Sequence, residues 1–183
     1  MVDALRIILL VALAAAALTT AGLTLAWWME PRRRLRRALD KTLGGSPEVE
    51  AVSPAEGRAC ALDFDSGQAA VLWDRGANGL VYDFDEIDGA EMIVDGHVLA
   101  RVRRGEARRA LDVMAPDAGQ VVLRLMFADP RHPEFELDLW NVATGASTGS
   151  PPEALRLGRR WLSHVEALMK ESRPGLPAVR AKG

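Results

Sequence analysis

Hydrophobic residues follow three different patterns along the chain, and the first is an unbroken apolar stretch. It runs for 22 residues without a charge, from Ile7 to Trp28. A helix rises about 1.5 Å per residue, so this stretch would measure roughly 33 Å, enough to cross the hydrocarbon core of a bilayer. We therefore expect residues 1–30 to form a transmembrane segment, with Trp27 and Trp28 in the headgroup layer.

A cleaved secretory signal peptide is the alternative interpretation of this segment, and it would place the rest of the chain outside the cytoplasm. Small residues at 14–16 and 19–21 keep this alternative open. However, the apolar run is longer than the usual hydrophobic region of a signal peptide, and Asp3 offsets Arg6 in front of it. Basic residues beside a span stay in the cytoplasm. We therefore expect a single-pass protein of the inner membrane with its body on the cytoplasmic side. The orienting residues are Arg32, Arg33, Arg34, Arg36 and Arg37.

Residues 31–57 are predicted to be a short basic helix followed by a polar tether. Apolar residues recur there at helical spacing, and the arginines occupy the remaining faces. The sequence Gly44-Gly45-Ser46-Pro47 then ends the helix. Beside the membrane, such a helix either binds anionic lipid or only fixes the topology of the span.

From residue 58 the pattern alternates between apolar and polar residues, which is typical of strands. It predicts seven strands, at 58–65, 69–73, 80–84, 90–94, 97–103, 120–128 and 135–140. The first five are short and separated by turn residues, so we expect them to form an antiparallel meander. In the last strand, 135–140, one face should be core and the other mostly wet.

A helix is predicted after the last strand. Ser150, Pro151 and Glu153 match a capping box, in which Ser caps the helix and Glu binds back to the cap. The helix should end near Ser172 and pack on the open side of the sheet, and residues 173–183 should form a disordered tail. Its apolar stripe consists of Leu157, Trp161, Val165 and Leu168.

Seven short antiparallel strands closed by one amphipathic helix resemble the bacterial membrane-anchored pleckstrin-homology-like (PH-like) proteins. ALDFDSGQAAVLW and LVYDFDEIDGAEM add local similarity, with Asp85-Glu86-Ile87 as the turn between two strands. The resemblance covers 58–172 and implies an α+β, mainly β, sandwich or open barrel. It also implies binding of lipid, peptide or protein. Lipid-binding members carry basic residues in the first hairpin loop, whereas this loop is Asp65-Ser66-Gly67-Gln68, so phosphate recognition is not expected.

Charge is distributed unevenly behind a formal net charge of −2. Residues 1–43 carry 7 basic and 3 acidic side chains (net +4), residues 44–150 carry 9 and 19 (net −10), and residues 151–183 carry 7 and 3 (net +4). The acidic body disfavours binding to nucleic acid and to anionic lipid. Lipid contact is expected only through residues 7–28 and the arginine cluster.

Few residues indicate catalytic chemistry. His97, His132 and His164 are isolated from one another, and His132 with Glu134 is a weak acid/base candidate in a proline-bracketed turn. Cys60 alternates into a strand and is expected to be buried rather than nucleophilic. The densest carboxylates are Asp63, Asp65, Asp83, Asp85, Glu86 and Asp88.

Two functional hypotheses follow. The first is a membrane-tethered binding or scaffold protein that presents an acidic PH-like domain to an unidentified cytoplasmic protein. It has no cofactor, metal or catalytic residue, and the face of Tyr82 or Trp140 is its candidate contact surface. The alternative is a metal-dependent enzyme built on the acidic turns around Asp83 to Asp88.

Overall fold

A computed structural model describes residue 10, residues 12–20, residue 22, and residues 30–110, 117–147 and 149–171. The described residues of the predicted transmembrane stretch are helical, but Trp27, Trp28 and much of that stretch lie outside the described set. No helix among the described residues is long and apolar enough to cross a membrane. The tail predicted over 173–183 also lies outside them.

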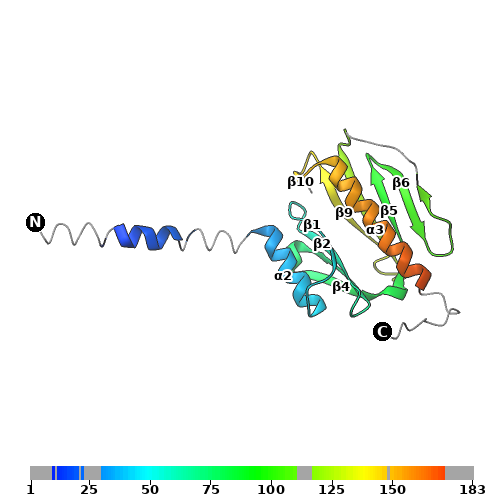
Figure 1. Ribbon diagram of the computed structural model, residues 1–183, viewed down its shortest axis with the longest axis horizontal. Helices are drawn as coiled ribbons and strands as arrows, with labels where there is room; N and C mark the ends of the chain where they lie inside the picture. The colour runs from blue at the N-terminus through cyan, green and yellow to red at the C-terminus, as the bar shows by residue number, and fades with distance from the viewer. Residues whose placement is uncertain are drawn as a thin grey trace, which may run out of the picture.

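The first sheet is a four-stranded antiparallel meander in chain order (Figure 1). It includes three of the predicted strands. Its members are β1 (Val49–Ser53), β2 (Arg58–Asp63), β3 (Gln68–Trp73) and β4 (Asn78–Asp83). A short 3-10 turn, η1 (Asp74–Gly76), joins β3 to β4.

The second sheet has six antiparallel strands in the order β10-β9-β8-β5-β6-β7. Four of them match predicted strands, and two have only two residues each. They are β5 (Ile87–Val94), β6 (His97–Arg103), β7 (Arg109–Ala110), β8 (Gln120–Phe127), β9 (Glu134–Asn141) and β10 (Ala146–Ser147). The described chain therefore has ten strands rather than the seven predicted.

The predicted meander of five strands is wrong after β4, because β4 and β5 belong to different sheets. The 3-10 turn η2 (Phe84–Glu86) separates them, and reciprocal bonds between Asp83 and Glu86 cap it. β5 then pairs with both β6 and β8. Gly89 allows this close packing, since an added Cβ there would lie 2.4 Å from the Val102 carbonyl oxygen.

The predicted basic helix is present as α2 (Pro31–Leu43), but it is part of the folded body rather than a separate juxtamembrane element. α2 lies against the first sheet (Figure 1), and its Leu35 and Leu39 are buried there. The predicted tether is also wrong in part, because residues 49–53 form β1 and pair with β2. The residues of the sheet that receive α2 are Val52, Ala59, Ala61, Ala70 and Leu72.

Both faces of the first sheet are therefore covered. α2 packs on one face, while Cys60, Leu62 and Val71 on the other face join the main core. α2 supplies the second apolar surface here. Small residues such as Ala59 and Ala61 on the α2 side let the helix approach the sheet closely.

The C-terminal helix α3 (Pro151–Glu171) begins directly after Ser150, as predicted, and packs on the second sheet. The carbonyl of Ser150 accepts a hydrogen bond from the Ala154 amide, which starts the helical ladder. Trp161 and Val165 are fully buried in the main core. The expected α+β architecture, two antiparallel sheets with a C-terminal helix packed against them, is confirmed.

Candidate binding pocket between the two sheets

A pocket of about 260 Å³ lies where the first sheet meets the start of the β8–β9 hairpin. Strands β2, β3 and β4 supply one wall, and the end of β8, the following turn and the start of β9 supply the other. Its lining combines aromatic and aliphatic side chains with three polar ones. The lining residues are Arg58, Val71, Trp73, Leu80, Tyr82, Phe127, His132, Glu134 and Phe135.

Stacked rings form much of the pocket wall. Tyr82 of β4 stacks on Phe127 of β8, with ring centroids 4.0 Å apart and an interplanar angle of 13°. Trp73 at the end of β3 stacks on His132, with centroids 6.1 Å apart. These pairs join the first sheet to the β8–β9 hairpin, and all four rings line the pocket.

Tyr82, Asp129 and His132 form a polar network at the pocket. The Tyr82 hydroxyl donates a hydrogen bond to Asp129 Oδ2 at 3.3 Å, and His132 Nδ1 lies 3.6 Å from the same oxygen. Burial, followed by the charge of Asp129, raises the pKa of Tyr82 to about 12. The Arg131 amide donates to Asp129 Oδ1 at 2.8 Å, and this bond is the main reason that the pKa of Asp129 lies below its usual value.

Arg58 and Glu134 border the pocket, and both are engaged by neighbours. The Arg58 guanidinium carbon lies 5.8 Å from the centroid of the Phe135 ring, and its Nη1 donates to the Glu136 carbonyl at 2.9 Å. Glu134 Oε2 lies 3.6 Å from Arg124 Nε. Arg58 therefore supplies a positive charge held in place over an aromatic ring.

The predicted pairing of His132 with Glu134 is only partly matched by the geometry. Both residues line the pocket, but His132 turns its Nδ1 to Asp129, while Glu134 turns to Arg124. An aromatic pocket with a few fixed polar groups at its border is the usual form of a ligand site. The arrangement is therefore suited to holding an apolar or aromatic group.

The acidic turns of the alternative hypothesis bind their own backbone. Glu86 Oε2 accepts a hydrogen bond from the Asp83 amide at 2.8 Å. Arg104 donates to the carbonyls of Asp85 and Ile87 and lies 3.7 Å from Asp88 Oδ1. Among the residues that the structure describes, no three His, Cys, Asp or Glu side chains are grouped to hold a metal ion.

A second acidic cluster links the turn before β2 to β9. The Asp138 amide donates to Glu56 Oε2 at 3.3 Å, and Gln120 Nε2 donates to the Asp138 carboxylate at 3.0 Å. Desolvation, followed by the charge of Asp138, raises the pKa of Glu56. The cluster thus places two carboxyl groups at one joint between the sheets.

The remaining candidates are separated in space. Cys60 is buried in the main core, as expected, and burial raises the pKa of its thiol. His97 is exposed on β6. His164 lies on α3 beside Phe64, at 5.5 Å between ring centroids. Desolvation, followed by the charge of Arg160, lowers the pKa of His164.

The arginine cluster lies on α2. Arg32, Arg34, Arg36 and Arg37 are exposed, and Arg33 is half-buried. Arg33 pairs with Glu30 at 2.6 Å, and Arg36 pairs with Glu50 of β1. The two tryptophans predicted to accompany them, Trp27 and Trp28, lie outside the described residues.

Sequence reasoning found Tyr82 but missed most of the pocket. Tyr82 is buried rather than exposed, and its ring lines the pocket. Trp140, the other candidate contact residue, instead donates its indole N–H to the Ala118 carbonyl at 2.9 Å. Trp73 and Phe135 were missed because β3 and β9 are far apart in the sequence, and only the packing of the two sheets brings them together.

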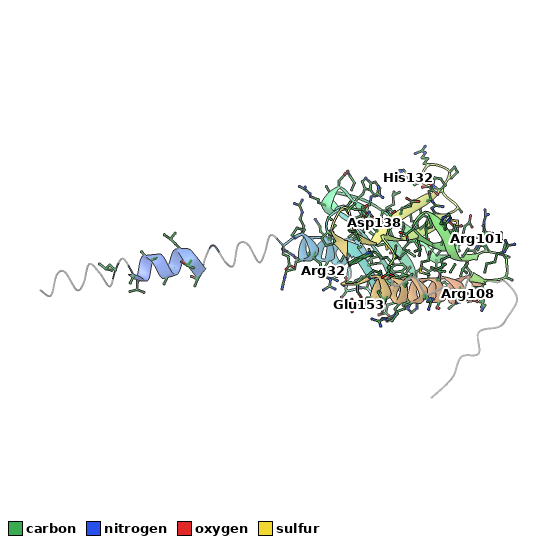
Figure 2. The ribbon with its side chains drawn as sticks, turned by 90° about the horizontal axis from the view of Figure 1, so that it is seen from above. Arg32, Arg101, Arg108, His132, Asp138 and Glu153 are labelled. Carbon is green, nitrogen blue, oxygen red and sulfur yellow. The ribbon has the colours of Figure 1, made fainter. Side chains whose placement is uncertain are left out.

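Figure 2 shows His132 on the opposite side of the body from Glu153, in the first turn of α3, and from Arg108, which pairs with Glu166 of α3. The pocket therefore faces away from the C-terminal helix. Comparison of the chain with known protein families, curated proteins and solved structures finds no match.

Proposed function

We propose that this protein is a single-pass inner-membrane protein that presents its β-rich body to a protein partner in the cytoplasm. The observation that carries the binding role is the aromatic pocket of about 260 Å³ between the two sheets. Trp73, His132 and Phe135 give it a surface suited to an apolar group. Its polar groups are engaged in holding the walls, which favours a binding role over a catalytic one.

The membrane tether rests on the uncharged stretch from Ile7 to Trp28 and on the arginines that follow it. Arg32, Arg34 and Arg37 of α2 are exposed and can contact anionic lipid, while Leu35 and Leu39 hold the helix to the sheet. The body would then stand close to the membrane in a defined orientation, because no flexible tether separates α2 from the first sheet.

The PH-like classification is part of the proposal. Two antiparallel sheets and a C-terminal helix support it. The second sheet departs from a simple meander, because β8 pairs with β5. A PH-like scaffold is used for binding rather than for one fixed chemistry, which is consistent with the pocket.

Photo-crosslinking in cells tests the binding role. A photo-crosslinking amino acid replaces His132 at the pocket, and in a matched strain it replaces Glu153, on the other side of the body (Figure 2). We expect a protein adduct from position 132, reduced by Trp73→Ala, and none from position 153. Equal adducts at both positions, or none at 132, would contradict the proposal.

A further inference from the structure

Strand β4 is an open edge of the first sheet. It pairs with β3 on one side, and the sheet order places no other described strand beside it. β1, at the opposite edge of the same sheet, packs against β9. The edge strands of the second sheet, β7 and β10, have two residues each. β7 and β10 cover only two residues each of β6 and β9. β4 is a six-residue edge that another strand could join, and it also borders the pocket.

The usual devices that protect an edge strand are missing from β4. Its sequence NGLVYD contains no proline and no basic residue, and its register with β3 has no bulge. Val81 is 40% exposed. An exposed edge of this kind is a template for another extended chain.

The hydrogen-bond pattern shows which backbone groups face outward. The Phe84 amide donates to the Gly67 carbonyl at 3.1 Å, so the backbone N–H of Phe84 points toward the side of the strand on which β3 lies. In an antiparallel pair, every second residue directs its backbone N–H and C=O groups to the neighbouring strand. The backbone groups of Tyr82 and Leu80 therefore bond to β3, whereas those of Val81 and Gly79 point away from it. The outward amide at Asp83 is already bound by Glu86, which limits the open edge to about four residues.

The pocket lies directly beside this open edge. Leu80 and Tyr82 of β4 line it, together with Trp73 of β3. A chain that pairs with β4 would direct every second side chain toward the same face as Leu80 and Tyr82. An apolar side chain from that chain can therefore enter the pocket while its backbone bonds to the edge.

Charge around the edge indicates the kind of segment that would bind. The exposed carboxylates at the end of β4 and in η2 are Asp83, Asp85 and Glu86, and Glu134 at the pocket border has a side chain that is 58% exposed. Arg58 also borders the pocket, but it is held over the Phe135 ring and by the Glu136 carbonyl. These carboxylates favour basic side chains and disfavour pairing with a second copy of the same acidic edge.

We infer that β4 is a docking edge for an extended, basic segment of a partner protein, which pairs with Gly79 and Val81 and places an apolar side chain in the pocket. This inference rests on the proposed binding function and names the form of its partner. Backbone pairing would supply affinity, and the pocket and the carboxylates would supply selectivity.

The test uses the full chain in nanodiscs of neutral lipid and a fluorescent, capped hexapeptide in which lysine alternates with phenylalanine and leucine. Val81→Pro removes one outward N–H and blocks the edge without touching the bonds to β3. Val81→Thr is the matched control, since threonine keeps both the shape and the N–H. We expect the proline variant to bind at least about tenfold more weakly, and the threonine variant to bind like the wild type.

Two further peptides separate edge pairing from simple charge attraction. A version with N-methylated backbone groups and a version with glutamate in place of lysine should both bind at least about tenfold more weakly. Equal binding by either peptide, equal binding to Val81→Pro, or no binding of the first peptide at about 1 mM would overturn the inference. So would a wild-type dimer that Val81→Pro dissociates. In any of these cases, an adduct from position 132 in cells would still support the proposed binding function.

Discussion

Replacing Leu39 with alanine tests whether α2 belongs to the folded body. Leu39 is completely buried between α2 and the first sheet. The change removes three carbon atoms, worth about 2.4 kcal/mol of transfer free energy. Rigid strands bearing small residues cannot close the remaining cavity, so the total loss should reach about 3 kcal/mol. At about 3 °C per kcal/mol for a body of this size, the unfolding midpoint should fall by roughly 9 °C.

The assay is urea unfolding of the full chain in mild detergent, followed by tryptophan fluorescence, with thermal unfolding as a second measurement. Thr42→Ala is the matched control, since Thr42 lies on the same helix and is exposed. It should change the free energy of unfolding by less than about 0.5 kcal/mol. If Leu39→Ala changed the free energy of unfolding as little as Thr42→Ala, α2 would not be packed on the sheet. The helix would then be a separate juxtamembrane element.

Three other measurements follow from the structure. Gly89→Ala should cost about 1–3 kcal/mol of stability because its Cβ would meet the Val102 carbonyl, while Gly45→Ala, with open space around it, should be neutral in the same unfolding assay. Ultraviolet titration of the single tyrosine, Tyr82, should give a pKa of about 12, and Asp129→Asn should lower it. The pKa of Glu56 is higher in the folded state than in the unfolded state. Ionisation of Glu56 therefore lowers the free energy of unfolding once the pH rises above the pKa of this group in the unfolded state. The free energy of unfolding of Glu56→Gln, measured relative to the wild type, should therefore be higher at pH 7 than at pH 4. The same relative value at both pH values would refute this.

Local patterns predicted most of the strands and the helices α2 and α3. Alternation located β6, β8 and β9, and the Ser150-Pro151 signal placed the start of α3. These features depend on residues close together in the sequence. Prediction failed at β1, whose residues VEAVS lie between Pro47 and Pro54 and looked like a polar tether. Its burial depends on pairing with the next strand, β2, and on the covering of the sheet by α2, which local polarity does not show.

The apolar runs in β2 and β3 indicate that these strands are buried on both faces. ACAL and AAVLW contain consecutive apolar residues, which is the pattern of strands buried on both faces rather than one. That pattern could have predicted that both faces of the first sheet are covered, as they are by α2 and by the main core. The five-strand meander failed for a different reason, since sheet membership after β4 depends on the turn at Phe84 and on pairing with β8.

The candidate site was the least predictable part of the protein. Tyr82 could be singled out as the only tyrosine, but its stacking partner Phe127 is 45 residues away in the sequence. Nothing in local spacing links Trp73 to His132, because a turn after β8 brings them together. Binding pockets formed between sheets depend on tertiary packing, so hydrophobic periodicity could not show this one.

The central proposal, a membrane-tethered body in the cytoplasm, is tested most directly by the topology of the intact chain. A reporter that fluoresces only in the cytoplasm and a reporter active only outside it would each be fused after Gly183, with membrane fractionation of both fusions. We predict a membrane-bound fusion with a cytoplasmic signal. A soluble fusion, or activity of the external reporter, would contradict the tether, the orientation and the choice of partner together.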